Sequence, residues 1–344
     1  MEYEPFSLRL ASPLDTAAGR IDRREGFLVR VTRDGVVGVG EATPLPGWTE
    51  SRDACEAALA DATAADTVDD ALESLSATSH PAARHGFELA ALDADARVAG
   101  ESVADALASD GSADAVPVNA TVGDGTVAET AAATREAVAA GHPAVKVKVG
   151  ARAPGEDEER LRAVRDAAGD GVELRADANG AWDAATARRL LDVAADLDFA
   201  YVEQPLPAES VAGHAALRGR GVDVALDESL AAVGPEAVLD AAAADVLVCK
   251  PMALGGPFRT VDVTGRAAEC DVDVVVTTTI DAAVARVGAL HTAASLPDCG
   301  ACGLATGSLL ADDVAPDPAP VVDGAMAVPA GPGLAGEAFA ALRG

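Results

Sequence analysis

From residue 116 onward, the sequence repeats one pattern: a short run of β-branched residues, then a helical stretch rich in Ala, Arg and Glu. This alternation favours parallel strands joined by helices, and eight such runs predict a closed α/β barrel, with a doubly wound sheet as the alternative. The expected strands cover residues 116–122, 144–149, 172–179, 200–206, 222–229, 245–251, 272–279 and 302–306.

The residues before the repeat have a different texture. Alternating apolar side chains before residue 40 predict strands, and a Gly- and Pro-rich loop covers 40–48. An Ala-rich stretch with helical spacing follows at 50–109. We predict a small α+β domain over 1–115 and the barrel over 116–315. The last segment, 316–344, is rich in Pro, Asp and Gly, and we expect it to leave the barrel and complete the first domain.

The charge of the chain excludes some partners. There are 56 acidic and 26 basic residues, which gives a formal net charge of −30. This charge repels phosphate backbones and anionic lipid, so we expect neither nucleic acid nor membrane as a partner. No apolar run of about 18 residues and no signal-peptide pattern occurs, and we expect a cytoplasmic protein. The even spread of acidic residues predicts a halophilic protein, with compositional drift in a GC-rich genome as the alternative.

The five cysteines are an odd number in a long chain, which favours reduced thiols over a disulfide framework. Cys299 and Cys302 form a single CxxC motif. A structural zinc site needs four ligands, and no second CxxC or nearby pair of histidines supplies the other two. We therefore expect an incidental pair of loop cysteines.

Only three of the 26 basic residues are lysines: Lys146, Lys148 and Lys250. Lys146 and Lys148 are two positions apart on one expected strand, so their side chains point the same way, roughly 7 Å apart. Two ammonium groups at that distance disfavour each other's charged form, which suits a lysine that acts as a base. The alternative, two surface lysines on an edge strand, is disfavoured because the chain otherwise avoids lysine.

Polar residues end successive strands at a regular interval. Lys148, Asp177, Glu203, Asp227, Lys250 and Thr279 are separated by 29, 26, 24, 23 and 29 residues. Barrel enzymes carry their catalytic groups at these carboxyl ends. Three carboxylates that converge there cannot all ionise without a cation, and ligands that are all oxygen favour Mg²⁺ or Mn²⁺ over zinc. Each acid alone would be explained as a helix N-cap.

This pattern resembles the muconate-lactonising branch of the enolase superfamily, which has Lys-x-Lys on the second barrel strand, Asp, Glu and Asp on the third to fifth, and Lys on the sixth. Residues 40–51, GEATPLPGWTES, are similar to the capping-domain loop of the o-succinylbenzoate synthases in that branch. Residues 175–179, 250–256 and 306–310 are similar to their barrel motifs. The resemblance implies an α/β fold: a TIM-like (β/α)7β barrel with an α+β N-terminal capping domain.

The resemblance also implies a function. It implies a hydro-lyase of menaquinone biosynthesis that dehydrates a succinyl-substituted hydroxycyclohexadiene carboxylate to o-succinylbenzoate. Lys148 is then the base, Lys250 a cation opposite it, and Asp177, Glu203 and Asp227 the ligands of Mg²⁺ or Mn²⁺. The expected partner is a small carboxylate substrate, and a homo-oligomer is compatible with the sequence. The residues expected to support the site or bind substrate are Lys146, Arg175, Asn179, Thr278, Thr279, Gly307 and Ser308.

Departures from the family pattern bear on the alternatives. Position 305 is Ala where relatives carry Asp, and no Asp-x-Asp follows, which argues against a dipeptide epimerase. All five histidines lie away from the strand ends, which argues against a histidine-dependent racemase. An N-acylamino acid racemase that uses Lys148 and Lys250 in alternation stays open. So does a barrel-derived binding protein without activity, although the complete set of ligands and lysines disfavours it.

Overall fold

The computed structural model describes residues 1–16 and 19–344. The capping domain begins with an antiparallel sheet of three strands, β1 (Glu2–Thr16), β2 (Gly19–Arg33) and β3 (Val36–Ala42). Asp34 and Gly35 join β2 to β3 with φ angles of 50° and 80°. Two residues with positive φ form the tight hairpin turn whose twist matches the strands, and Asp-Gly is a favoured pair for it. Four helices complete this region: α1 (Arg52–Thr63), α2 (Val68–Ser74), α3 (Pro81–Ala99) and α4 (Val103–Leu107).

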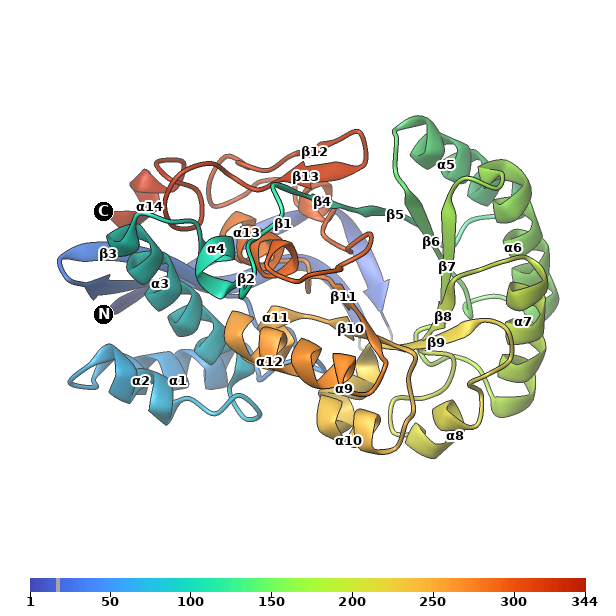
Figure 1. Ribbon diagram of the computed structural model, residues 1–344, viewed down its shortest axis with the longest axis horizontal. Helices are drawn as coiled ribbons and strands as arrows, with labels where there is room; N and C mark the ends of the chain where they lie inside the picture. Colours follow the sequence, from blue (N-terminus) through green and yellow to red (C-terminus); the bar gives the residue numbers. More distant parts are fainter. Residues whose placement is uncertain (17–18) are drawn as a thin grey trace.

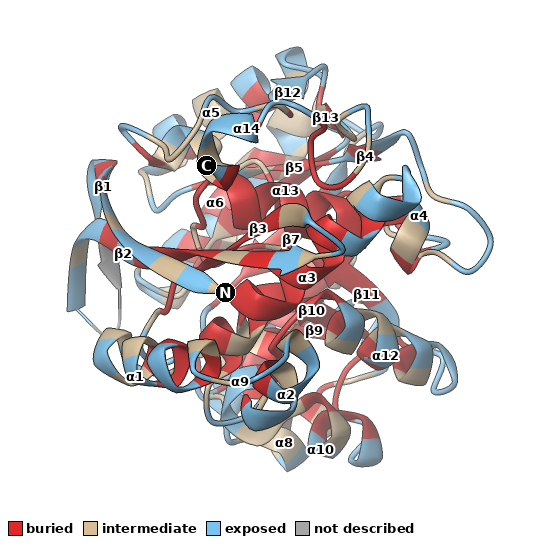
Figure 2. Ribbon diagram, turned by 90° about the vertical axis from the view of Figure 1, so that its left-hand side faces the viewer, coloured by how far each residue is buried: buried red, intermediate tan, exposed pale blue. Residues whose placement is uncertain are grey.

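Helix α3 packs against β3 at close range. Pro81 occupies its first turn, and Gly100 ends it in the left-handed conformation. A Cβ atom at Gly40 of β3 would lie 2.0 Å from the carbonyl oxygen of Gly86 in α3. These two glycines therefore let the helix backbone approach the sheet directly. Figure 2 shows α3 among the most deeply buried elements, between the sheet and the barrel.

The second region is a parallel sheet of seven strands that follow one another in chain order, and the same sequence runs predicted them. They are β5 (Asn119–Val122), β6 (Ala144–Lys148), β7 (Glu173–Asp177), β8 (Tyr201–Glu203), β9 (Asp223–Leu226), β10 (Val246–Cys249) and β11 (Asp273–Val276). Their helices are α5 (Val127–Ala139), α6 (Pro154–Ala168), α7 (Ala184–Asp196), α8 (Val211–Ala215), α9 (Glu228–Val233), α10 (Pro235–Asp240), α11 (Pro251–Leu254), α12 (Pro257–Ala268) and α13 (Ala283–Ala294).

Two residues of the eighth run join the ends of this sheet. Cys302 forms a parallel bridge with Val118, next to β5, and Gly303 forms one with Thr277, next to β11. The predicted TIM-like barrel is therefore confirmed, but the strand expected over 302–306 is reduced to these bridges, and a 3-10 turn follows at Gly307–Leu309. No helix in the described ranges is long and apolar enough to cross a bilayer.

The C-terminal segment returns toward the capping domain. β12 (Val321–Val322) and β13 (Ala325–Ala327) form a small antiparallel sheet with β4 (Ala115–Pro117). The last helix, α14 (Ala340–Arg343), places the Arg343 guanidinium 3.1 Å from the Asp93 carboxylate of α3. Asp93 also accepts the backbone N–H groups of Val39 and Leu334, both over 2.8–2.9 Å. This buried carboxylate thus ties three distant parts of the chain together, and both chain ends lie on the capping side (Figure 1).

Candidate active site

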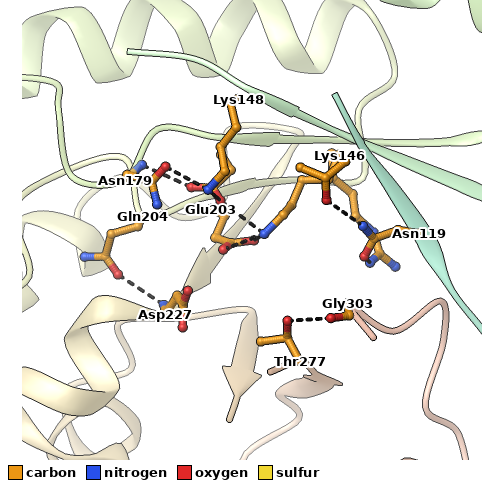
Figure 3. Close-up of polar contacts among 12 residues, drawn as sticks. Asn119, Lys146, Lys148, Asn179, Glu203, Gln204, Asp227, Thr277 and Gly303 are labelled. Atoms are coloured by element: carbon orange, nitrogen blue, oxygen red, sulfur yellow. Dashed lines mark hydrogen bonds and ion pairs between the residues drawn. The ribbon is translucent and has the colours of Figure 1, made fainter. Parts of the chain in front are cut away.

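The carboxyl ends of the barrel strands carry a row of charged side chains. Lys148 of β6 is the register partner of Asp177 in β7, and Asp177 is the partner of Glu203 in β8. Asp227 and Lys250 directly follow β9 and β10. Parallel strands in register place their last residues side by side. The polar residues that end successive strands therefore form one continuous site. Figure 3 shows the lysines of β6 and the acidic groups facing one another.

Lys146 is held in the interior by two carboxylates. Its Nζ lies 2.9 Å from both oxygens of Glu203 and 3.1 Å from Oδ2 of Asp177. Burial alone would lower the pKa of Lys146, but these carboxylates raise it well above its usual range. With these contacts in place, Lys146 is favoured in its protonated form, which suits a positioning role better than that of a base.

Lys148 has a more open environment. Its Nζ donates to Oδ2 of Asp177 over 2.7 Å and to Oδ1 of Asn179 over 2.9 Å, and 36% of its side chain is exposed. Asn179 has a φ of 44°, in the left-handed region that Asn tolerates, and its Nδ2 donates to Oε1 of Glu228 over 2.9 Å. Burial and the Asp177 charge raise the pKa of Glu228. The chain Glu228–Asn179–Lys148 therefore orients the lysine at the accessible edge of the site.

Lys250 lies across the row from Lys148. Its ammonium group contacts both oxygens of Asp227, and the ring centroid of Trp48 lies 3.7 Å from Nζ. A cation over an aromatic face is stabilised by the ring quadrupole. Trp48 belongs to the loop after β3, so the capping domain contributes a wall of the site. Trp48 is part of the sequence motif at residues 40–51, but its contact with Lys250 could be recognised only in the folded structure.

Gln204 is a further residue that sequence analysis missed. Its φ is 43°, and its Oε1 accepts the N–H groups of Asp227 over 3.1 Å and Ser229 over 3.2 Å. Its Nε2 donates to Oγ of Ser229 over 2.9 Å. The amide therefore fixes the backbone that carries Asp227. Its position directly after Glu203 was the only signal in the sequence, and an uncharged side chain gave no reason to select it.

Arg175 does not lie where we expected it. The side chain is buried, donates over 2.6 Å to Oε1 of Glu173 and to the Ala301 carbonyl, and stacks 5.0 Å from the Tyr201 ring centroid. Glu173 and Tyr201 begin their strands, so the guanidinium points toward the opposite end of the barrel from the carboxylates. Arg175 shares the strand parity of Asp177 and lies inside the barrel, but a long side chain can extend along the axis in either direction.

The residues expected after the seventh and eighth strands form a second group. The hydroxyls of Thr278 and Thr306 lie 2.9 Å apart, and Thr279 bonds to Asp281. Gly307 lies against the Arg286 guanidinium, where a Cβ atom would approach to 3.2 Å, and Ser308 is exposed. Within the described residues, no hydrogen bond joins Thr278, Thr279, Gly307 or Ser308 to the lysines and carboxylates. Their contact with substrate stays a prediction.

Two of the three acidic residues of the row, Glu203 and Asp227, are destabilised in their charged form. Burial and the Asp177 carboxylate raise the pKa of Glu203 to about 7, and burial raises that of Asp227 to about 6 despite Lys250. Asp177 behaves differently, because Lys146 and Lys148 outweigh burial and hold its pKa well below the usual range. The lysines therefore do not fully compensate the charge of these carboxylates, and an additional cation would stabilise their ionised form.

The donor set fits a divalent cation in chemistry and in charge. Asp177, Glu203 and Asp227 are buried and offer only oxygen, the ligand that Mg²⁺ prefers. In the described part of the chain, no three carboxylate, imidazole or thiol groups surround one point. The reason is visible in the contacts: Lys146 bridges Asp177 and Glu203, while Lys250 binds Asp227.

A capped α/β barrel with lysines on both sides of three strand-end carboxylates defines a class of barrel enzymes that act at a carboxylate-rich mouth. The family follows from sequence models: residues 129–338 match the enolase C-terminal domain-like family, and residues 5–108 match the N-terminal domain of mandelate racemase and muconate-lactonising enzymes. The chain belongs to this enolase superfamily, which confirms the resemblance seen in the motifs.

Curated relatives share a segment of this chain. An o-succinylbenzoate synthase from Thermobifida fusca is 40% identical over 220 residues, which cover 62% of this chain and 67% of that protein. An o-succinylbenzoate synthase from Mycobacterium tuberculosis is 42% identical over 223 residues, which cover 62% of this chain and 64% of that one. The similarity thus spans about two thirds of the relatives' length.

Solved structures resemble the whole chain. An L-Ala-D/L-Glu epimerase from Bacillus subtilis superposes with a TM-score of 0.87 at 26% identity, over 97% of both chains. A dipeptide epimerase from Methylococcus capsulatus, in complex with Mg and a dipeptide, gives 0.85 at 28% identity over 97% of this chain and 98% of that one. A muconate-lactonising enzyme from Pseudomonas fluorescens gives 0.85 at 25% identity, over 97% and 95%.

Proposed function

We propose that this enzyme is an o-succinylbenzoate synthase. The observation that carries the proposal is the unequal environment of the two lysines that flank the row. Lys148 is partly exposed and lies at the edge of the site, whereas Lys250 is buried, contacts both oxygens of Asp227 and lies under Trp48. This asymmetry favours a reaction with one base. Dehydration needs one base, while racemisation by two lysines needs both to exchange protons.

Asp177, Glu203 and Asp227 would hold Mg²⁺, with Mn²⁺ as the alternative. When bound, the ion would supply positive charge to the substrate carboxylate. Lys146 holds Asp177 and Glu203 in place, as its contacts with both acids indicate. Gln204 performs the same positioning for Asp227 through the backbone N–H.

The proton steps fall to Lys148. Its neutral amine would remove the proton next to the substrate carboxylate, and the ammonium formed would then return that proton to the departing hydroxide. One water molecule leaves, the ring becomes aromatic, and Lys148 regains its starting state. Lys250 would stabilise the negative charge that develops in between, as a cation that does not exchange its proton.

An N-acylamino acid racemase is the second candidate. The similarity of the fold to epimerases at 26% and 28% identity favours it, as does the presence of lysines on both sides of the row. In that reaction Lys148 and Lys250 would each act on one enantiomer. Lys250 would then have to release Asp227 in every cycle.

A single experiment distinguishes the two candidate functions. The purified protein is supplied with Mg²⁺ and either the cyclohexadiene precursor or each enantiomer of an N-succinylamino acid in heavy water. We expect o-succinylbenzoate to form, with loss of activity on chelation, and exchange of the α-proton to be confined to the enantiomer that faces Lys148. Rapid exchange of both enantiomers without dehydration of the precursor would assign the racemase instead.

A further inference from the structure

Cys299 and Cys302 lie in the segment that closes the barrel, away from the lysines and carboxylates. Their sulfur atoms are 3.0 Å apart. Cys302 is buried, while Cys299 is partly exposed on a surface loop that begins after α13. A disulfide bond requires about 2.05 Å between sulfurs, so an approach of roughly 1 Å would join them.

The two cysteines are held differently by their surroundings. The Cys302 N–H donates to the Pro117 carbonyl over 2.8 Å, and its own carbonyl accepts the N–H of Asn119 over 3.0 Å. Gly303, the next residue, is bonded to Thr277 (Figure 3). Gly300, in contrast, is exposed, and a Cβ atom there would meet nothing within 4 Å. Cys302 is therefore fixed, and the loop that carries Cys299 has space to adjust.

We propose that Cys299 and Cys302 form a redox-active dithiol that reacts with small aliphatic disulfides. Cys299 is the attacking thiol, because it is the less buried of the two cysteines. Cys302 is the resolving thiol, because it is buried within contact of the Cys299 sulfur. No third cysteine, histidine or acid completes a metal site with them in the described part of the chain.

The electrostatic environment supports this division. The contact between the two sulfurs and, less strongly, the Arg175 cation lower the pKa of Cys299 despite its burial, while the same contact, together with burial, raises the pKa of Cys302. Thiolates attack disulfides, whereas thiols do not, and CxxC motifs commonly lower the pKa of the exposed cysteine.

The reaction is balanced by the external disulfide. The Cys299 thiolate attacks one sulfur of the reagent, whose S–S bond breaks and releases one thiolate. The Cys302 thiol loses its proton and attacks the Cys299 sulfur, which forms the internal disulfide and releases the second thiolate. Two cysteine thiols are oxidised, and one small disulfide is reduced to two thiols.

The probe is hydroxyethyl disulfide, a neutral reagent that the net charge of −30 does not repel. Cys270 is the matched internal control, because it is exposed, follows α12 and contacts no other cysteine among the described residues. After reaction of the folded protein, peptide masses should show the peptide with Cys299 and Cys302 lighter by two hydrogens and free of reagent. Cys270 should keep the reagent as a mixed disulfide, and reduced dithiothreitol should reverse both changes.

Substitutions separate the two roles. Cys302→Ser should trap the reagent on Cys299, with a mixed disulfide that persists about 100-fold longer than in the wild type. Cys299→Ser should leave Cys302 unmodified, and Cys270→Ser should leave the internal disulfide unchanged. Two results with the wild-type protein would overturn the proposal. In one, Cys299 keeps its mixed disulfide with the reagent as Cys270 does. In the other, Cys299 stays unmodified after Cys270 has reacted fully. The wild-type comparison decides even where a variant fails to fold.

Discussion

The three lysines differ in the number of carboxylate oxygens around each ammonium group. Lys146 has three oxygens within 3.1 Å, from Asp177 and Glu203, whereas Lys148 has one carboxylate oxygen and one amide oxygen. A lysine surrounded by acids keeps its proton, and a partly exposed one can exchange it. Proximity on one strand therefore does not make the two residues equivalent.

The proposed division of labour between Lys146 and Lys148 can be measured. Lys148→Ala should reduce exchange of the substrate α-proton by about 10²–10⁴-fold, the usual contribution of a general base. Lys146→Arg keeps a cation that can bind both acids, so it should retain measurable exchange and bind Mg²⁺ within about 10-fold of the wild type. If Lys146→Arg loses α-proton exchange as completely as Lys148→Ala does while it still binds Mg²⁺, then Lys146 is the base.

Glu203 provides a separate test of the metal site. Glu203→Gln keeps the shape of the side chain but removes a negative charge from the buried row. The affinity for Mg²⁺ should fall by about 10-fold or more, since removal of even an outer partner of a metal site has effects of this size. Calorimetric titration measures the affinity, and Glu173→Gln at the opposite end of β7 is the control. Equal titrations for Glu203→Gln and the wild type would show that Glu203 is not a ligand.

At this scale the sequence predicted which residues would lie together but not how each is held. The regular interval between the polar residues at strand ends predicted that Lys148, Asp177 and Glu203 lie in one row, because the fold fixes the register of its parallel strands. Trp48 and Arg175 could not be placed in the same way. Trp48 reaches Lys250 from another domain, and the direction of Arg175 along the barrel axis depends on its partners Glu173 and Ala301.

Among the elements, α3 and α12 meet at a contact that leaves no room for a side chain. Glu88 of α3 accepts the N–H of Phe258 over 2.9 Å, at the start of α12. Gly256 precedes this turn with a φ of 140°, and a Cβ atom there would lie 2.1 Å from Oε1 of Glu88. The contact links the capping domain to the barrel through one buried carboxylate and one glycine.

Two glycine substitutions near this contact should therefore have opposite effects. Gly256→Ala should lower the free energy of unfolding by about 2 kcal/mol or more, because the conformation is strained for alanine and Glu88 blocks the space. Gly265→Ala lies within α12, where nothing is within 4 Å, and should raise it by about 0.5–1 kcal/mol. Urea unfolding of both variants measures the difference, and equal effects would show that the contact is not rigid.

His291 of α13 links α4 to the C-terminal segment in its neutral form. Its Nδ1 accepts the N–H of Ala104 over 3.0 Å, so Nε2 carries the proton and donates it to the Leu334 carbonyl over 2.6 Å. Burial lowers the pKa of His291 to about 4, although Leu334, Asp93 and Asp105 pull it upward. A proton on Nδ1 would abolish the bond from Ala104.

This arrangement predicts a pH dependence of stability with a definite sign. The unfolded histidine titrates near 6.5, so its contribution is complete above about pH 6.5 and is lost as the pH falls toward 4. The difference in unfolding free energy between the wild type and His291→Gln should shrink by about 2 kcal/mol or more from pH 7.5 to 4.5. His80→Gln is the control and should keep the wild-type pH dependence. A difference that stays constant with pH would contradict the assignment.

The strands and the two-region layout were predictable because β-branched runs and helical spacing are local properties of the chain. The eighth strand was not, because its pairing depends on the neighbouring strands: Cys302 forms one bridge with Val118 beside β5, Gly303 forms one with Thr277 beside β11, and the pairing ends there. The run over 302–306 contains Gly303, whose Cβ would lie 2.4 Å from the Thr277 hydroxyl, so the backbones approach too closely for a regular strand with side chains there.

The whole molecule carries a net charge of −30, and its acidic groups are spread over the surface, as the side chains of Asp53 and Glu337 illustrate with exposures of 97% and 84%. Mutual repulsion of these groups destabilises the compact state. The screening length falls from about 10 Å at 0.1 M salt to about 3 Å at 1 M, so added KCl weakens this repulsion. Ion pairs on the surface lose strength too, but each contributes less than about 1 kcal/mol.

We therefore expect the thermal midpoint to rise by about 1–2 °C or more between 0.1 M and 1 M KCl, which corresponds to about 1 kcal/mol of stability for a chain of this length. A variant with six exposed carboxylates changed to their amides separates charge from general effects of salt. Repulsion scales with the square of the net charge, so its salt response should be smaller by about one third. A midpoint that does not move with KCl, or an equal response in both proteins, would reject surface repulsion as the cause. The six positions are Glu73, Asp110, Asp114, Glu159, Asp166 and Asp240.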